Sequence, residues 1–532
     1  MAEQPIATTI TPARRAVIMG CVMMATMIFV MNQTNVIVAL PHMQGTFSAT
    51  QDQIAWVLTS FIVALTIMTA STGWLSARLG RKRLYLVALG GFTVTSFLCA
   101  TASSLEAEVG FRALQGALGA PIIPLSQAIV LDAYPKERHG AALGLWGIGI
   151  TVGPVFGPIV GGYATEMGNW PWVFWFNVPV GAVILIGILL SVPDAAPDRT
   201  RKLDWAGFAT LALALAAVQF VLNRGERLDW FASSEIIIAF ALFLLGTYVF
   251  VVHSMTTAEP FVPRALVRDR NVMLGYLLIF LWGTVLHSPL VLLSLRLQGL
   301  ENYPVIATGM LMAPRGVGGV LAMALVGRSL RRINARHLFG FGLLCVASAT
   351  WYMSNWPTQA LDRDVMITAF VFGFGIAFAW VPLSMLTLST IDTRHRTEGV
   401  VFFNLILNMG TGVGITLAVL VFTKSIQINH EALTAFVTPY NKVFNDALLP
   451  SLWGLGRRSS LPLLDSEIGR QAMTIAFNNS FLLIALVALA AIPLVYGFRR
   501  PRRANSPEAG RPAPTRAEPV RVPLPRPAGR TR

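Results

Sequence analysis

The sequence predicts an all-helical protein that crosses a membrane many times. Hydrophobic residues make up 54 % of the 532 residues and charged residues only 13 %, whereas soluble domains carry about 25 % charged residues. Fourteen apolar segments follow one another along the chain, and each has the roughly 18 to 25 residues that a helix needs to cross a bilayer. Clusters of Lys and Arg occupy every second connection between them.

The charged connections predict how the chain crosses the membrane. By the positive-inside rule, the cationic connections face the cytoplasm, and both termini lie on the same side. The expected spans are residues 16–40, 53–75, 84–103, 109–131, 141–164, 173–192, 205–223, 235–253, 272–296, 305–327, 338–354, 365–389, 398–423 and 475–497. The cationic connections contain Arg14 and Arg15; Arg78, Arg81, Lys82 and Arg83; Lys136 and Arg138; Arg199, Arg201 and Lys202; Arg264, Arg268 and Arg270; Arg328, Arg331, Arg332 and Arg336; and Arg394 and Arg396.

A weak internal repeat divides these spans into two halves. Gly73 precedes Arg78 at the end of the second span, and Gly327 precedes Arg332 at the same spacing at the end of the tenth. Two repeated halves around a site at the bilayer midplane are the architecture of alternating-access carriers. We expect one six-helix bundle in residues 1–192, a linker with two inserted helices in residues 193–260, and a second six-helix bundle in residues 261–497.

The C-terminal tail, residues 498–532, differs from the rest of the chain. It contains ten arginines and eight prolines but only two acidic residues. Such a segment cannot bury a core, so we expect a disordered cytoplasmic tail. Nucleic-acid binding is not expected, because no aromatic residue follows Phe498. Attraction to anionic lipid of the bilayer explains the charge better.

Enzymatic activity is not expected. The chain contains no Walker loop, no cluster of metal-ligand residues and no hydrolase elbow, which are the patterns that would indicate ATP binding, metal chemistry or a nucleophile. We therefore predict no catalytic residue, no metal and no cofactor.

The fifth expected span is unusually rich in glycine and proline. Glycines 149, 153 and 157 recur every four residues and so share one helix face, where another helix can approach closely. Close packing against another helix would by itself be enough to explain this four-residue spacing. A longer pattern resembles the fifth-span antiporter motif of major facilitator superfamily drug exporters, and it is filled by Gly144, Gly153, Gly157, Pro158, Gly161 and Gly162.

The turn after the second span supports the same resemblance. Residues 73–83 read GWLSARLGRKR, which is similar to the superfamily's cytoplasmic signature, with Gly73, Arg78, Gly80 and Arg81 at the matching positions. The usual acidic residue is absent, since Ala77 stands there. Glycine permits a tight turn, and the cations can meet helix C-termini and acidic side chains.

Three further stretches narrow the family. Residues 170–181, 203–231 and 124–127 resemble the sixth span, the seventh span with its outer loop, and part of the fourth span of EmrB-type permeases. The sequence therefore resembles those of fourteen-span drug/proton antiporters. This resemblance implies the major facilitator fold, two six-helix bundles plus two inserted helices, in the bacterial inner membrane. It also implies proton-coupled export of lipophilic small molecules together with a periplasmic adaptor protein and an outer-membrane channel.

Two departures from the family concern charge. Asn32 stands where relatives carry an acidic residue in the first span, and Leu407 stands where they often carry an arginine in the thirteenth. If the two positions meet across the bundle, losing both charges is more favourable than losing one, because a single unpaired charge inside a membrane costs more free energy than two neutral residues. We expect the proton carrier to lie elsewhere in the chain or to be missing.

Four residues remain as candidates for proton coupling. Glu108 precedes Arg112 by four residues, a spacing that favours an ion pair on a helix, and the pair is either structural or responsive to protons. His287 could titrate near neutral pH, or it could join helices by a hydrogen bond. Arg315 follows a proline, so it could instead brace a kink.

A substrate cavity is expected between the two halves. Aromatic and amide side chains in such a pocket would bind planar lipophilic compounds with little directional demand. The scarcity of acidic residues favours neutral or acidic compounds over strongly cationic ones. The predicted cavity residues are Asn32, Gln33, Thr34, Asn35, Gln115, Gln127, Phe378, Trp380, Asn404 and Asn408.

Two features leave the function open. A long outer loop near residues 424–473 should have its own structure or a partner. The loss of charge at Asn32 and Leu407 favours an alternative, an uncoupled or differently coupled exporter of an endogenous metabolite. A membrane sensor or scaffold is a third possibility, which the intact fifth-span glycine pattern argues against.

Overall fold

A computed structural model of the chain describes residues 11–135, 138–167, 169–194, 204–257, 260–391, 395–438 and 461–498. Within these ranges every regular element is helical. The predicted tail beyond Phe498 and the middle of the predicted outer loop, residues 439–460, lie outside the described residues.

The first group of helices, here called the amino bundle, packs largely on itself, with α1 along α7, α3 along α5 and α4 along α9. Its members are α1 (Pro12–Thr46), α2 (Gln51–Ile54), α3 (Trp56–Leu79), α4 (Arg81–Ala100), α5 (Leu105–Gly119), α6 (Ile122–Ala133), α7 (His139–Met167), α8 (Trp172–Trp175) and α9 (Asn177–Ser191). Two helices, α10 (Trp205–Arg224) and α11 (Ser234–Thr256), then pack against each other, with the short turn η3 (Trp230–Ala232) between them.

The remaining helices, here called the carboxy bundle, pack through α13 on α19, α16 on α18 and α17 on α18 and α20. They are α12 (Arg264–Arg268), α13 (Arg270–Leu286), α14 (Ser288–Leu295), the π-turn η4 (Arg296–Leu300), α15 (Val305–Met312), α16 (Pro314–Ser329), α17 (Ala335–Met353), α18 (Asp362–Leu388), α19 (Arg396–Thr434), α20 (Leu461–Leu494) and η8 (Val495–Gly497). Residues up to Phe498 form one compact unit. The structure therefore does not test the predicted bundle boundaries near residues 192 and 260.

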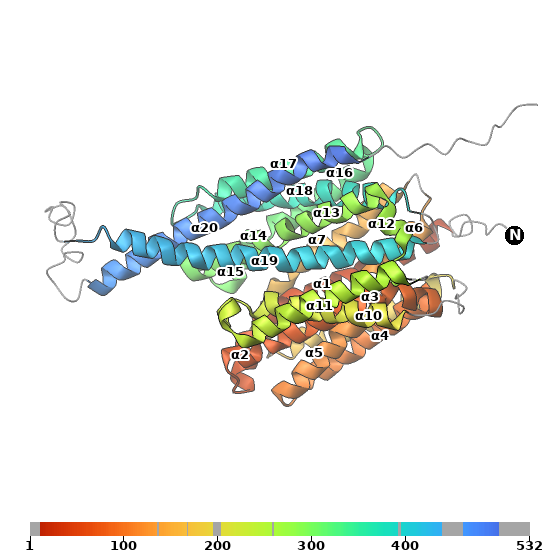
Figure 1. Cartoon of the computed structure of the whole chain (residues 1–532), viewed down its shortest axis with the longest axis horizontal. Helices are drawn as coiled ribbons and strands as arrows, with labels where there is room; N and C mark the ends of the chain where they lie inside the picture. The colour runs from red at the N-terminus through yellow and green to blue at the C-terminus, as the bar shows by residue number, and fades with distance from the viewer. Residues whose placement is uncertain are drawn as a thin grey trace, which may run out of the picture. The chain divides into compact units, whose positions relative to one another are not determined.

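Thirteen helical stretches of the described chain are long and apolar enough to cross a membrane. The one expected span that is not among these thirteen, residues 338–354, is the helix α17 (Figure 1). The all-helical class and the fourteen expected helices are therefore confirmed.

Three expected spans are interrupted next to a proline. The breaks separate α5 from α6 at Pro121, α13 from α14 before Pro289, and α15 from α16 before Pro314. Proline has no N–H and clashes with the preceding turn, so it interrupts the helical hydrogen-bond ladder. Such breaks are tolerated in a membrane only where neighbouring groups bond the freed carbonyls.

The glycine face of α7 lies against α1. A Cβ atom added to Gly149 would lie 2.6 Å from the carbonyl oxygen of Met23, and one added to Gly153 would lie 3.0 Å from that of Met27. One added to Gly161 would lie 2.9 Å from Asn35. The contacts rise in residue number along both helices, so α1 and α7 run in the same direction. The predicted packing seam is present, and no side chain larger than hydrogen fits in it.

The turn between α3 and α4 depends on Gly80. Its φ of 84° lies in the left-handed region, which glycine adopts without steric cost. Arg81 then forms an ion pair with Asp132 at the end of α6, and Arg78 lies 5.3 Å from the ring centre of Trp74.

The last two helices extend well beyond the predicted spans. Helix α19 has 39 residues and α20 has 34, and both run past the neighbouring helices of the carboxy bundle in Figure 1. At 1.5 Å per residue, α19 is about 58 Å long, nearly twice the roughly 30 Å thickness of a bilayer core. The predicted outer loop therefore starts after Thr434, not at residue 424, because polar residues such as Lys424 end an apolar run without ending a helix.

Asp204 joins the inserted helices to the start of the carboxy bundle. Its carboxylate accepts hydrogen bonds from the N–H groups of Gly207 (2.9 Å) and Phe261 (3.1 Å) and lies 2.8 Å from Nε2 of His253. Burial raises the pKa of Asp204, but the Gly207 N–H, His253 and the Phe261 N–H together hold that pKa below its usual value of 3.8.

We predict that Asp204→Asn lowers the thermal unfolding temperature of the purified protein at pH 7, because the variant loses a charged cap and acceptor worth about 1 kcal/mol or more. A carboxylate with a lowered pKa stabilises the fold above its unfolded pKa and loses that effect as the pH falls through the folded value. The difference from the native chain should therefore persist down to about pH 4 and vanish below it. The control is Asp229→Asn, since Asp229 is exposed; equal effects of both variants would contradict the prediction.

Candidate functional site

A fully buried arginine, Arg112 of α5, is bonded to neutral oxygen atoms. Its Nη1 donates to Oδ1 of Asn32 (3.0 Å) and to Oε1 of Gln115, and its Nε donates to the carbonyl oxygen of Val57 (3.3 Å). Its guanidinium also lies 4.2 Å from the ring centre of Phe61. A buried guanidinium costs less when several oxygens and an aromatic face solvate it. Asn32, at the position where the family resemblance implies an acidic residue, is therefore a partner of Arg112.

Glu108 lies one turn before Arg112 and is also fully buried. Neither of its carboxylate oxygens is bonded to a nitrogen or oxygen donor in the described part of the chain, and Nη2 of Arg112 likewise has no partner there. The buried thiol of Cys99 is an electrostatic neighbour of Glu108. The structure thus brings Glu108 and Arg112 onto one helix without the hydrogen-bonded ion pair that their spacing predicts.

The two uncharged positions, Asn32 and Leu407, make their contacts in different bundles. Asn32 bonds Arg112, whereas the carbonyl oxygen of Leu407 in α19 packs against Gly283 of α13. No contact between these two positions is found among the described residues, so the condition under which losing both charges together is favourable is not seen there. Because Asn32 is neutral, it does not neutralise the positive charge of Arg112.

Two other polar residues of this part of α1 donate to backbone carbonyl oxygens. Thr34 donates to the carbonyl oxygen of Met31 (3.0 Å), and Asn35 donates to that of Val173 (3.4 Å). Gln33 is half-buried. Gln115 extends the Arg112 network by donating to Oγ of Ser96 (2.7 Å). Together, Asn32, Arg112, Gln115 and Ser96 form a continuous polar network inside the amino bundle.

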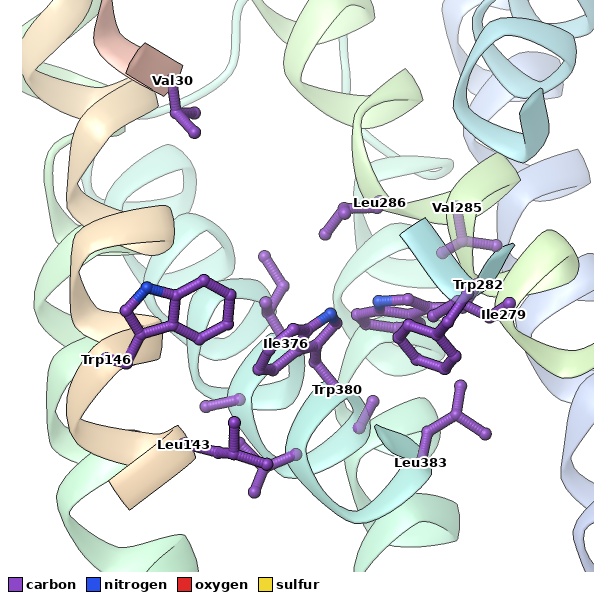
Figure 2. Packing of buried hydrophobic residues seen from close by; sticks show 14 of the residues in the cluster. Val30, Leu143, Trp146, Ile279, Trp282, Val285, Leu286, Ile376, Trp380 and Leu383 are labelled. Carbon is purple, nitrogen blue, oxygen red and sulfur yellow. The ribbon is translucent and has the colours of Figure 1, made fainter. Parts of the chain in front are cut away.

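A layer of four side chains joins the two bundles. Asn404 of α19 donates to Oε1 of Gln127 of α6 (3.1 Å), and the rings of Trp146 of α7 and Trp380 of α18 are 5.5 Å apart. Each residue lies six to eight positions from the end of its helix, which corresponds to about 9–12 Å along the axis. Figure 2 shows Trp146, Trp380 and Trp282 at one level. We call Gln127, Asn404, Trp146 and Trp380 the cross-bundle layer.

This layer lies near the end of the molecule at which α1 and α7 begin. Close to it, the backbones of α7 and α16 meet at glycines: a Cβ atom added to Gly144 would lie 2.9 Å from the carbonyl oxygen of Met323, and one added to Gly327 would lie 2.8 Å from Cα of Ala141. Gly73 likewise packs on Glu398, whose Cγ would lie 3.2 Å from an added Cβ. Pro158 and Gly162 lie further along α7.

The remaining candidates lie apart from this layer. Phe378 packs in the carboxy bundle against Phe341 (5.4 Å) and Phe374 (5.0 Å). Asn408 is half-buried. His287 ends α13, and its Nδ1 has no partner among the described residues. Arg315 is buried and donates from Nη2 to the carbonyl oxygen of Leu286 (2.9 Å), which agrees with a brace at the α13–α14 break.

Sequence reasoning missed Trp146, Thr26 and Ser96. The indole N–H of Trp146 donates to Oγ1 of Thr26 (2.9 Å), which fixes the ring that faces Trp380. The signal was present for Trp146, because it stands two residues after Gly144 in the glycine-rich run. Thr26 and Ser96 carry no sequence signal of this kind. Across the described residues, no group of three or more His, Cys, Asp or Glu side chains is placed to hold a metal ion.

We predict that Asn32→Leu destabilises the protein by roughly 1–3 kcal/mol, because it removes an acceptor from the buried charge of Arg112. Thermal unfolding in detergent measures the effect. The control is Asn408→Leu, since Asn408 is half-buried and makes no contact with Arg112. Asn32→Asp should act in the opposite direction by pairing with Arg112. Equal destabilisation by both leucine variants would contradict the role given to Asn32.

We also predict that Gln127→Leu loosens the cross-bundle layer. The loss of one hydrogen bond, worth about 1 kcal/mol, should raise the open population roughly fivefold. Hydrogen exchange of the backbone amides in residues 127–133 and 139–146 measures this in lipid nanodiscs. Gln219→Leu is the control, because Gln219 is buried but bonds Asn223 within α10. Exchange that is no faster in Gln127→Leu than in the control would show that the layer does not hold this end closed.

Comparisons with known proteins agree with this architecture. Residues 22–415 match the model of the Major Facilitator Superfamily. The chain is 30 % identical over 483 residues to multidrug export protein EmrB of Escherichia coli (strain K12), covering 90 % of this chain and 94 % of the relative. It is 31 % identical over 470 residues to fatty acid resistance protein FarB of Neisseria gonorrhoeae, covering 88 % and 92 %. The crystal structure of the human organic anion transporter MFSD10 (TETRAN) shares the fold, with a TM-score of 0.59 at 15 % identity over 90 % of this chain and all of that one. The chain therefore belongs to the Major Facilitator Superfamily of membrane transporters, within the family of EmrB multidrug export proteins.

Proposed function

We propose that this protein exports lipophilic small molecules in exchange for protons, by alternating access, across a bacterial inner membrane. The end closed by the cross-bundle layer would face the cytoplasm, because the cationic connections of the chain gather there under the positive-inside rule. In this arrangement both termini are cytoplasmic, and the structure corresponds to a state that is closed toward the cytoplasm. The glycine seam of α7 and the Gly73–Arg81 turn would guide the rearrangement between states.

One observation supports proton coupling above the others: Glu108 is a fully buried carboxyl group that forms no hydrogen-bonded ion pair within the described residues and has the thiol of Cys99 and the guanidinium of Arg112 as its neighbours. Such a group is stable inside a membrane only when it carries its proton. Nη2 of Arg112, one turn away, has no partner among these residues either. It can therefore receive the carboxylate when the proton leaves. In this proposal Glu108 replaces the acidic residue that Asn32 has lost.

The extended part of α19 and α20 supports a proposal about partners. Both helices continue beyond the membrane thickness at the end opposite the cross-bundle layer. We propose that this pair is where a periplasmic adaptor protein, which leads to an outer-membrane channel, meets the transporter. Residues Ile428, Phe436, Leu461 and Leu463 are exposed there, and apolar side chains outside a bilayer are suited to contact with a partner.

A second candidate function is export of an endogenous metabolite without proton coupling. The observation in its favour is that Asn32 and Leu407 carry no charge, so the positions that are charged in relatives cannot titrate. If Glu108 carries the proton, substrate binding should release protons. If the neutral residues Asn32 and Leu407 mean that coupling is lost, substrate binding should release none. One experiment distinguishes the two.

We predict that addition of Nile red, a neutral lipophilic dye, to the purified protein in weakly buffered detergent at pH 7 releases protons. Release should disappear in Glu108→Gln and persist in Glu106→Gln, because Glu106 is exposed on the same helix. Dye binding is measured separately by fluorescence. Binding without proton release in the native chain would contradict the role of Glu108 and support uncoupled export; proton release gained in Asn32→Asp would then locate the lost carrier in α1.

A further inference from the structure

Asn177, the first residue of α9, is a fully buried amide without a hydrogen bond. Its side chain is 0 % exposed, and neither Oδ1 nor Nδ2 has a partner within the described residues. Burying an unbonded amide costs free energy, and nearly all buried polar groups of folded proteins are bonded. Asn177 caps no helix here, because a cap would itself be a hydrogen bond. The amide is therefore suited to gain its partner in another state of the protein.

The packing of α9 on α4 shows where Asn177 lies. Asn177 shares the buried face of α9 with Gly181, which packs directly on Thr93 of α4. Trp175, on the other side of Asn177, meets Phe97 of α4 with a ring distance of 5.1 Å. The two helices are therefore antiparallel, and Asn177 lies between these two contacts.

The residue of α4 at that level, Ser96, ends the polar network of Arg112. Oγ of Ser96 accepts from Nε2 of Gln115 (2.7 Å), and Oε1 of Gln115 accepts from Nη1 of Arg112. The ring of Phe174, three residues before Asn177, lies 5.7 Å from the guanidinium of Arg112. Both observations place Asn177 beside this network.

The surroundings of Glu108 decide how the network responds when its proton leaves. The titratable groups that face Glu108 are the thiol of Cys99 on α4 and Arg112 on its own helix. Helix α3 also packs on α5, and its Val57 and Phe61 contribute a carbonyl oxygen and a ring to Arg112 but no charge. Since Arg112 is the cation of this group and its Nη2 has no partner within the described residues, an ionised Glu108 attracts its guanidinium.

We propose that Asn177 is a positioning residue that stabilises the ionised form of Glu108. When the proton of Glu108 passes to water, Arg112 turns toward the carboxylate and releases Oε1 of Gln115. Nδ2 of Asn177 then donates to this oxygen. Asn177 is unpaired while Glu108 carries its proton and paired after the proton has left, and this difference favours ionisation. The inference rests on the proposed proton coupling through Glu108.

The test follows the protonation of Glu108 by infrared spectroscopy of the full-length protein in detergent, without substrate. The C=O band of a protonated carboxyl group that is present in the native chain and absent from Glu108→Gln reports this residue. In Asn177→Leu the midpoint of its pH titration should rise by about one pH unit, a tenfold change in the ionisation equilibrium. Thermal unfolding gives a second readout. Below the midpoint Asn177→Leu should be no less stable than the native chain, because it removes an unpaired amide, and above the midpoint it should be less stable.

Two further variants separate this role from packing. Thr93→Val alters the same α4–α9 contact one turn away, where Thr93 bonds only within α4 in the described chain, so the midpoint should stay unchanged. Asn177→Leu added to Gln115→Leu should move the midpoint no further than Gln115→Leu alone, because the proposed bond is already lost.

The outcomes distinguish this inference from the function on which it rests. If Glu108 titrates and the midpoint is the same in Asn177→Leu as in the native chain, the inference is overturned and Asn177 is a packing residue only. If the native chain has no titrating band that Glu108→Gln removes, proton coupling through Glu108 is overturned, and the inference with it.

Discussion

Every polar group that this chain takes into the membrane must find its partner within the protein, because hydrocarbon offers none. The proline-containing breaks and the buried arginines meet this constraint together. Pro289 frees the carbonyl oxygen of Leu286, and Arg315 of another helix occupies it. In the amino bundle, Asn32, Gln115 and Val57 serve Arg112 in the same way. At the α13–α14 break, removing Arg315 leaves the carbonyl oxygen of Leu286 without this donor, and closing the break leaves Arg315 without this acceptor.

The side-chain contacts of the cross-bundle layer, unlike those of the buried arginines, involve no charged group. The cross-bundle layer consists of an amide–amide hydrogen bond and a pair of indole rings, all uncharged. Each such contact contributes on the order of 1 kcal/mol. An alternating-access carrier must populate both states, which requires a free-energy difference of only a few kcal/mol. A buried ion pair in the same place would cost several kcal/mol to separate. Weak, neutral contacts at this end are therefore suited to repeated opening.

The sequence predicted the parts of this structure that local rules govern. Apolar run length located the helices, and the four-residue spacing of Gly149, Gly153 and Gly157 predicted the seam against another helix. It could not predict the partner of Arg112, because Glu108 has the favourable helical spacing whereas Asn32 is 80 residues away and meets it only in the fold. The sequence also predicted too early an end for α19. Hydropathy indicates which residues can lie in lipid, and it does not show that the helix continues past Lys424. That Phe378 lines a cavity stays a prediction, and its contact with Phe341 could not be predicted, because a buried aromatic residue gives no sign of which neighbour it will face.

The great length of α19 has a mechanical consequence. The helix contributes Asn404 to the cross-bundle layer, eight residues after its first residue, and its 39 residues are longer than a bilayer core is thick. A stiff rod of about 58 Å that tilts by about 10° moves its far end by about 10 Å. Any molecule held at that end would therefore sense whether the opposite end is open or closed, through the displacement of a single continuous helix and without a signal passing from residue to residue.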